Sequence, residues 1–312
     1  MKVEHKQPVN RLESGVPGVT HREIADGLRR LGVRAGMGVM VHSSLKSFGR
    51  VEDGARTVIE ALMEVITPDG TILMPSFNHG EPFEAGGPGC FDPRATRTTN
   101  GAIPDLFWRL PGVLRSLNPT HAFAAWGKNA ERYVRLHHRT LTMGTESPLG
   151  LLWKDGGCGL FLGTTYGCNT FHHVTTTVLK SPCIGVRTFA YHVALPDGRR
   201  VIGRSWGWRE EPCPLTDEAL PLYAPEMEKL GLHRQTVVGQ SHCTLFKLDD
   251  CHRLVLELLN DGKDGFRPCH QCPIRPRSVE EYRRIWPTAY SVAPDWDEEH
   301  DCLTPDSEAW NY

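Results

Sequence analysis

The stretch THREIADGLRRLGVRAGMGVMVHSSLKSFGRVEDGARTVIEALMEVITPDGTILM, residues 20–74, decides the fold. Thr20 and Glu23 have the spacing of a capping box, which predicts that a helix begins there. Apolar residues follow at helical intervals as far as Leu31, and Gly32 is a typical residue for ending a helix. The segment therefore opens with a helix over about residues 21–31.

Two short apolar runs, 38–41 and 71–74, flank a second helical pattern over residues 54–66. Runs of this length predict buried strands, so the segment reads helix, strand, helix, strand. The runs are apolar throughout, as in a sheet that is covered on both faces. We therefore expect an α/β fold with helices on both faces of the sheet.

The same reasoning extends along the chain and gives further helices near 103–110, 129–136, from 169, 215–231 and 251–259. Further strands are expected at 122–126, 159–163, 237–238 and 243–248, with a hairpin over 187–203. Residues 147–149 read as a turn. Residues 77–102 are rich in Gly, Pro, Asn, Thr and acids, and we expect a long functional loop there.

The pattern divides the 312 residues into three parts: an N-terminal arm at 1–19, one domain at 20–262, and a C-terminal extension at 263–312. The extension carries many prolines and an acidic run and has little core of its own. The N-terminus lacks the apolar core of a signal peptide, so we expect a cytoplasmic location. No apolar run is long enough to span a membrane.

The formal net charge is −2, which argues against nucleic acid as a partner and fits a small cationic one. Ten cysteines are scattered along the chain, and several are expected to be small buried hydrophobes. Four residues of the extension have a spacing that could hold a structural zinc ion, although the second pair is irregular: Cys269, Cys272, His300 and Cys302.

Polar clusters follow three of the expected strands, and ligands of open α/β sheets bind at such strand ends. The first cluster, residues 42–47, offers hydroxyls, main-chain amides and Lys46 for phosphate oxygens. It is also consistent with a plain polar turn. The second cluster spans 116–121, and the third, 164–173, contains the adjacent His172 and His173. Neighbouring helical side chains diverge by about 100°, so at most one of these two histidines should face a cleft.

Taken together, the sequence resembles the aminoglycoside 3-N-acetyltransferase family. Four blocks carry the resemblance, in matching order and spacing over about residues 20–260. They are VHSSLKSFG (41–49) with PDGTILMP (68–75); FDP (91–93) with GAIP (101–104); RSLNPTH (115–121) with AWG (125–127); and SPLG (147–150) with LFLG (160–163) and NTFHH (169–173).

The resemblance implies a three-layer α/β/α sandwich and direct transfer of an acetyl group from acetyl-CoA to an amine. It assigns the catalytic base to His173, four residues after Asn169, and an orienting carboxylate to Glu210 or Glu211. An imidazole suits proton abstraction from an ammonium near neutral pH. The implied coenzyme contacts are Ser43, Ser44, Leu45, Lys46 and Ser47, with Arg115 and Ser116 as additional candidates.

An aminoglycoside carries several ammonium groups, so its site should present carboxylates. The candidates are Glu81, Glu84, Asp92, Asp105 and Glu146. Because the loop 77–102 has no convincing match to the aminoglycoside enzymes outside its FDP and GAIP strings, another amine, such as a biosynthetic intermediate of a natural product, is an alternative acceptor. A second alternative is a non-catalytic binding module organised by a zinc-binding tail. The oligomeric state is left open, with a homodimer as one option.

Overall fold

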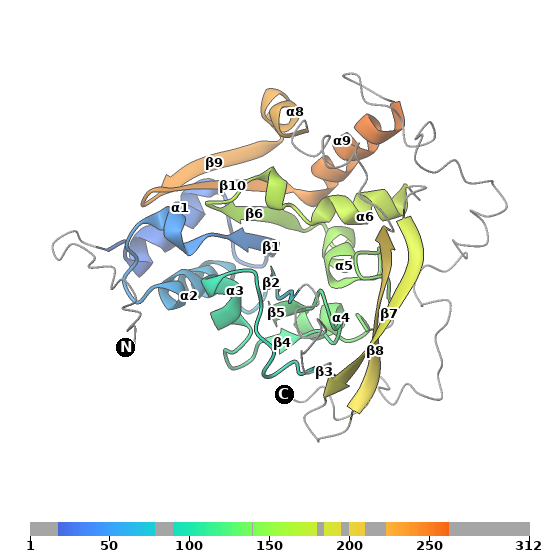
Figure 1. The fold of residues 1–312 in the computed structure, drawn as a ribbon. Helices are drawn as coiled ribbons and strands as arrows, with labels where there is room; N and C mark the ends of the chain where they lie inside the picture. The colour runs from blue at the N-terminus through green and yellow to red at the C-terminus, as the bar shows by residue number, and fades with distance from the viewer. Residues whose placement is uncertain are drawn as a thin grey trace, which may run out of the picture.

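The computed structural model describes residues 18–78, 90–138, 140–179, 184–194, 200–209 and 223–261. The expected sandwich is present. Seven strands form one sheet in the order β4-β5-β2-β1-β6-β10-β9, with helices on both faces (Figure 1). The order reflects a chain that starts at the centre of the sheet and adds its later strands toward both edges.

The helices are α1 His21–Leu31, α2 Ala55–Ile66, α3 Ala102–Phe107, α4 Ala130–Val134, α5 Pro148–Lys154, α6 Phe171–Val178, α8 Tyr223–Lys229 and α9 Leu248–Asp261, with short 3-10 helices η1 Leu45–Phe48 and η3 Tyr166–Cys168. The strands are β1 Gly38–Ser43, β2 Thr71–Pro75, β3 Cys90–Phe91, β4 Leu114–Arg115, β5 Phe123–Gly127, β6 Cys158–Leu162, β7 Ile184–Ala194, β8 Arg200–Arg209, β9 His233–Val238 and β10 Ser241–Lys247.

The opening helix begins where the sequence predicts. Both hydrogen bonds of the capping box are present between Thr20 and Glu23, and Gly32 ends the helix with a φ of 112°. Only glycine adopts that left-handed conformation at little cost. Val19, at the expected boundary of the N-terminal arm, forms an isolated bridge with Val51.

The centre of the sheet is parallel. β1 pairs in parallel with β2 on one side and with β6 on the other. β5 and β10 then pair antiparallel with β2 and β6 respectively. The carboxyl ends of β1, β2 and β6 therefore lie at one edge of the sheet, where β5 and β10 begin. We call this end of the strands the carboxyl edge, as distinct from the outer strands β4 and β9 that border the sheet.

Residues alternate between two cores, one on each face of the sheet. Val39 and Val41 of β1 pack with α1, α2 and α3, whereas Met40 between them packs with α4, α5, α6, α8 and α9. β6 repeats the pattern, with Leu160 and Phe161 on opposite faces. This alternation explains why the central strands are apolar on both faces between their polar ends, such as Ser43 of β1 and Thr71 of β2.

A second, smaller sheet contains the predicted hairpin. β7 and β8 pair antiparallel, and β3 joins β7 in parallel through Cys90–His192 and Phe91–Val193 (Figure 1). The expected loop 77–102 thus contains a short strand, and residues 79–89 lie outside the described part.

One local prediction was wrong. Residues 147–149 were expected to be a turn, but they start α5: the Ser147 hydroxyl accepts a hydrogen bond from Gly150 N at 3.2 Å, and Pro148 occupies the first helical turn. Ser as N-cap followed by Pro is a helix-start signal that also resembles a turn. Among the described residues, no helix is long and apolar enough to cross a membrane.

Candidate active site

The carboxyl edge collects polar residues from blocks that are far apart in the sequence. His42 and Ser43 end β1, and Ser76 follows β2 directly. The hydroxyls of Ser43 and Ser76 are buried and have no hydrogen-bond partner among the residues that the structure describes. Buried hydroxyls usually have hydrogen-bond partners. Two neighbouring hydroxyls that lack protein partners are therefore consistent with a site where a ligand supplies them.

His42 links this edge to the helix that carries the predicted base. Its side chain is 6% exposed, and its Nε2 lies 3.4 Å from the hydroxyl of Thr170, just before α6. The main-chain oxygen of His42 accepts a hydrogen bond of 3.2 Å from Thr164 Oγ1. Burial lowers the pKa of His42 to about 4, so the ring is neutral near pH 7.

The predicted coenzyme loop is the 3-10 helix η1 with the residues that precede it. Ser47 Oγ donates to Ser44 O at 2.7 Å and lies 2.8 Å from the hydroxyl of Ser241, the first residue of β10. Gly163 has a φ of 70°, and a Cβ atom there would collide with Ser47. The Ser47 hydroxyl is therefore used to fix the loop against β6 and β10.

Other groups of the loop remain suited to binding an anion. Ser44 N is engaged with Leu162 O at 2.9 Å, but the amides of Leu45 and Lys46 begin a helix and have no acceptor within it. Lys46 is exposed. Two adjacent amides beside an ammonium group match the oxygens of a phosphate.

His173 lies in the first turn of α6, at the carboxyl edge. Its side chain is half-buried, whereas that of His172 is 7% exposed. The main-chain oxygen of His173 accepts hydrogen bonds of 2.9 Å from the hydroxyls of both Thr176 and Thr177. The two neighbouring histidines therefore differ in burial, and His173 is the more accessible.

A family model described as "Aminoglycoside 3-N-acetyltransferase" matches residues 40–260 of the chain. The chain belongs to the aminoglycoside 3-N-acetyltransferase family. This membership confirms the resemblance drawn from the four sequence blocks. It also confirms the expected enzyme class, an acyltransferase with acetyl-CoA as co-substrate.

Among the relatives, the SPbeta prophage-derived aminoglycoside N(3')-acetyltransferase-like protein YokD of Bacillus subtilis (strain 168) is 32% identical over 250 residues, covering 74% of this chain and 89% of the relative. A structure of AAC-IIIb with CoASH has a TM-score of 0.69 at 26% identity and covers 79% of this chain and 98% of that one. AAC-VIa bound to sisomicin gives a TM-score of 0.67 at 25% identity, with 79% and 99% covered.

The side chains of Arg115 and Ser116, which were expected to contact the coenzyme, form hydrogen bonds within the protein. Ser116 is fully buried, and its hydroxyl lies 2.8 Å from His137 Nδ1 and accepts from Phe123 N at 2.9 Å. His137 Nε2 donates to Thr142 O at 2.9 Å, so Nδ1 must accept the Ser116 proton. Burial lowers the pKa of His137 to about 3 and keeps it neutral.

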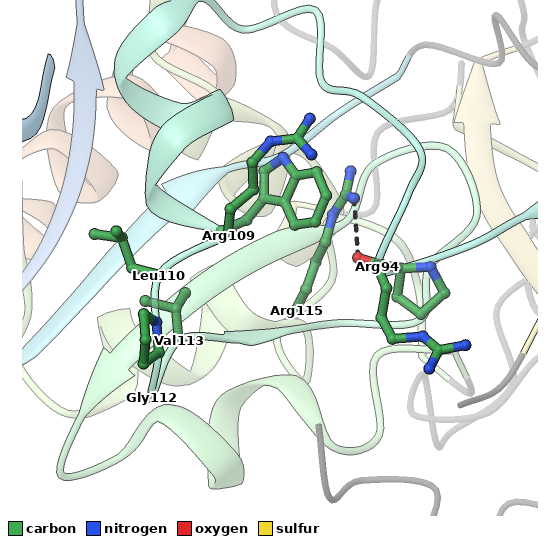
Figure 2. A pocket seen from close by; sticks show the side chains of 9 residues that line it. Arg94, Arg109, Leu110, Gly112, Val113 and Arg115 are labelled. Atoms are coloured by element: carbon green, nitrogen blue, oxygen red, sulfur yellow. Dashed lines mark hydrogen bonds between the residues drawn. The ribbon is translucent and has the colours of Figure 1, made fainter. Parts of the chain in front are cut away.

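Arg115 is 2% exposed and donates to three main-chain oxygens, those of Pro93, Thr96 and Ser76, at 2.6–3.2 Å. It helps to line a pocket of about 420 Å³ with Arg94, Trp108 and Arg109 (Figure 2). The guanidinium groups of Arg94 and Arg109 point in different directions in this view. The pocket thus lacks the convergent donors of a phosphate site.

Among the described residues, the predicted substrate carboxylates each have a local partner. Asp105 is bonded to Arg109 at 3.1 Å and to Trp108 Nε1 at 3.3 Å; partial burial raises its pKa, but these hydrogen bonds lower it overall. Asp92 accepts from Arg94 N at 2.8 Å, and Glu146 pairs with Lys154. Glu81 and Glu84, and the expected orienting acids Glu210 and Glu211, lie outside the described residues.

The proposed zinc ligands Cys269, Cys272, His300 and Cys302 also lie outside the described residues. Within the described ranges, no group of three or more His, Cys, Asp or Glu side chains could hold a metal ion. The structure adds two residues whose contacts the sequence did not suggest: His42, and Asn169, whose buried amide donates to Tyr223 of α8 and Cys251 of α9. Both occur in the blocks that carry the family resemblance, but their contacts with distant elements leave no local pattern.

Proposed function

We propose that this enzyme transfers the acetyl group of acetyl-CoA to the 3-amino group of an aminoglycoside, with His173 as general base. The single observation that carries the proposal is the position of His173: it lies in the first turn of α6, in the NTFHH block, at the same sheet edge as the proposed coenzyme loop. Aminoglycoside 3-N-acetyltransferase is the activity after which the family is named.

In the proposed reaction, His173 moves a proton from the acceptor to the leaving group. His173 takes a proton from the acceptor ammonium, because only the neutral amine is a nucleophile. The amine nitrogen then bonds to the thioester carbonyl carbon, and the carbon–sulfur bond breaks. The proton on His173 passes to the departing thiolate, and the second proton that the nitrogen loses as it becomes an amide goes to solvent. The reaction needs no acyl-enzyme, so it requires no catalytic cysteine. Glu210 or Glu211 remains our prediction for the carboxylate that orients His173.

The residues around Ser43 fit the coenzyme. The amides of Leu45 and Lys46 and the ammonium of Lys46 are donors for phosphate oxygens, and Ser43 offers a buried hydroxyl. AAC-IIIb has been solved with CoASH, and AAC-VIa with sisomicin, so relatives of the same fold bind both kinds of ligand. We assign the coenzyme to the loop 43–47 and the acceptor to the neighbourhood of His173.

Release of free thiol from acetyl-CoA in the presence of a panel of aminoglycosides tests the proposal. The wild-type enzyme should release thiol with at least one of them, and His173→Ala should lower kcat by about 10²–10⁴-fold. His21→Ala, on the first turn of α1, is the matched control and should keep full activity. Near-normal turnover of His173→Ala would show that the base is another residue.

The acceptor has one rival, an amine that is not an aminoglycoside. The observation in its favour is that Asp92, Asp105 and Glu146 are engaged by local basic groups or main-chain amides. Thiol release with none of the aminoglycosides, together with release in the presence of a simpler primary amine, would favour the rival. Cytoplasmic location also stays a prediction.

A further inference from the structure

The turn before α6 is fixed by a side chain buried inside the protein. Asn169 is 1% exposed, and its Nδ2 donates to the hydroxyl of Tyr223 at 3.1 Å and to Cys251 Sγ at 3.5 Å. Its Oδ1 accepts from Phe171 N at 3.2 Å. Because α8 and α9 hold one end of this amide and α6 the other, the main chain at residue 169 has a defined position.

His172 is attached to this fixed turn. Its Nδ1 is hydrogen-bonded to the main-chain oxygen of Asn169. A carbonyl oxygen only accepts, so the Nδ1 atom carries a proton and donates it. The bond sets both the tautomer and the orientation of the His172 ring.

The ring of His172 contacts that of His173. The two ring centroids are 3.9 Å apart, and the ring planes are inclined by 49°. At this separation, rotation of the His173 ring toward its neighbour is blocked by a ring that cannot readily move away. The contact therefore restricts the directions in which the nitrogen atoms of His173 can point.

We propose that His172 is a positioning residue, which transmits the fixed location of Asn169 to the ring of His173. The inference rests on the proposed function, in which His173 is the base. Proton abstraction needs a nitrogen lone pair directed at the ammonium proton, and small errors of orientation cost large factors in rate. His172 thus acts on the reaction without touching the substrate.

A plain core-filling role for His172 makes a different prediction. If the ring only fills space, its replacement alters the free energy of unfolding and leaves turnover per folded molecule unchanged. If it acts through His173, its replacement lowers kcat, and the effect disappears once His173 itself is removed. A double-mutant cycle separates these two roles.

The experiment compares His172→Phe, which keeps a ring but loses the Nδ1 donor, with His173→Ala and the double variant. Wild-type enzyme and all variants are assayed for thiol release from acetyl-CoA with the best amine acceptor. His172→Phe should lower kcat about tenfold with KM for acetyl-CoA changed less than about twofold. In the His173→Ala background, the same replacement should have no further effect.

The matched control is His252→Phe. His252 is also 7% exposed and also contacts α6, through a 3.1 Å contact between its Nδ1 and Thr175 Oγ1, but it faces Trp153 instead of His173. It should retain the wild-type kcat. A second variant, Tyr223→Phe, removes a partner of Asn169 and should lower kcat in the same direction as His172→Phe.

Two results would overturn the inference while leaving the proposed function intact: unchanged kcat in His172→Phe, or an equal loss of rate in the presence and absence of His173. Should His173→Ala retain its activity, the proposed function itself fails. Melting temperatures identify any variant that does not fold, and for such a variant His172→Gln, which keeps a donor, replaces His172→Phe in the cycle.

Discussion

The hydroxyls of Ser47 and Ser241 lie 2.8 Å apart, although 194 positions separate the two residues in the chain. The contact joins the proposed coenzyme loop to the first residue of β10, and Gly163 leaves the space in which the two side chains meet. The shape of the loop therefore depends on a strand that is formed near the end of the described chain.

Gly163→Ala should disrupt this arrangement. Alanine is disfavoured at a φ of 70°, and its Cβ would collide with Ser47, so we expect a loss of about 3 kcal/mol in the free energy of unfolding. Gly156→Ala is the matched control, because Gly156 has a φ of 76° but no atom near its missing Cβ. Chemical denaturation measures the free energy of unfolding of each variant. Equal losses would mean that the Ser47 contact contributes nothing.

Lys46→Ala should weaken coenzyme binding without harming the fold. We expect KM for acetyl-CoA to rise about fivefold with kcat nearly constant, and the difference from wild type to shrink in high salt. Lys128 is also exposed but follows the end of β5, at the opposite edge of the sheet, so Lys128→Ala should behave as wild type. Steady-state kinetics at two ionic strengths would decide the matter; an unchanged KM would argue against a coenzyme contact at Lys46.

Thr170→Val removes the hydroxyl that lies near His42 while keeping the size of the side chain. One neutral hydrogen bond contributes about 1 kcal/mol, so a loss of that size is expected in stability, accompanied by a kcat lowered about fivefold. The loss in kcat reflects a looser start of α6. If stability falls and kcat does not, the His42–Thr170 contact has no influence on the base.

Stability should fall as the pH is lowered from about 6.5 to 4. Burial depresses the folded-state pKa of His42 to about 4, so in this window the unfolded chain binds a proton that the folded protein rejects. The contribution of His42 to the free energy of unfolding is therefore fully present above pH 6.5, and about 3 kcal/mol of it is lost by pH 4. His137 should act in the same sense.

Denaturation curves of wild type and His42→Gln over this pH range measure the effect. The variant should lose less stability on acidification, because it lacks the group that titrates only in the unfolded chain. Parallel losses in the two proteins would mean that His42 is protonated in the folded state, in conflict with its burial.

The sequence predicted the layers of the fold well, because the middle residues of the strands at 38–43, 71–75 and 158–162 are apolar on both faces and the helices between them are amphipathic. It failed at residues 147–149, where a Ser-Pro pair is shared by turns and helix starts. It predicted the hairpin of the small sheet but not the pairing of β3 with β7, since a two-residue strand has no periodicity of its own.

The site was predicted less completely than the fold. A local block identified His173 and the loop 43–47, but burial and pairing depend on residues that are distant in sequence. Asp105 is an exception, because its partner Arg109 lies only four positions away and a local i,i+4 pattern could have indicated the pair. Ser116 was expected to contact the coenzyme, but its hydroxyl is hydrogen-bonded to His137 and to Phe123 N.

The pairing of β6 with β10 has a consequence for the order of folding. A chain emerging from the ribosome can assemble β1, β2 and β6 once residue 162 has been made, but the other edge of β6 stays open until residues 241–247 follow. For the synthesis of some eighty residues, a hydrophobic strand edge is thus available to other chains. The nascent protein is most prone to aggregate in that interval, and truncation before β10 would make this hazard permanent.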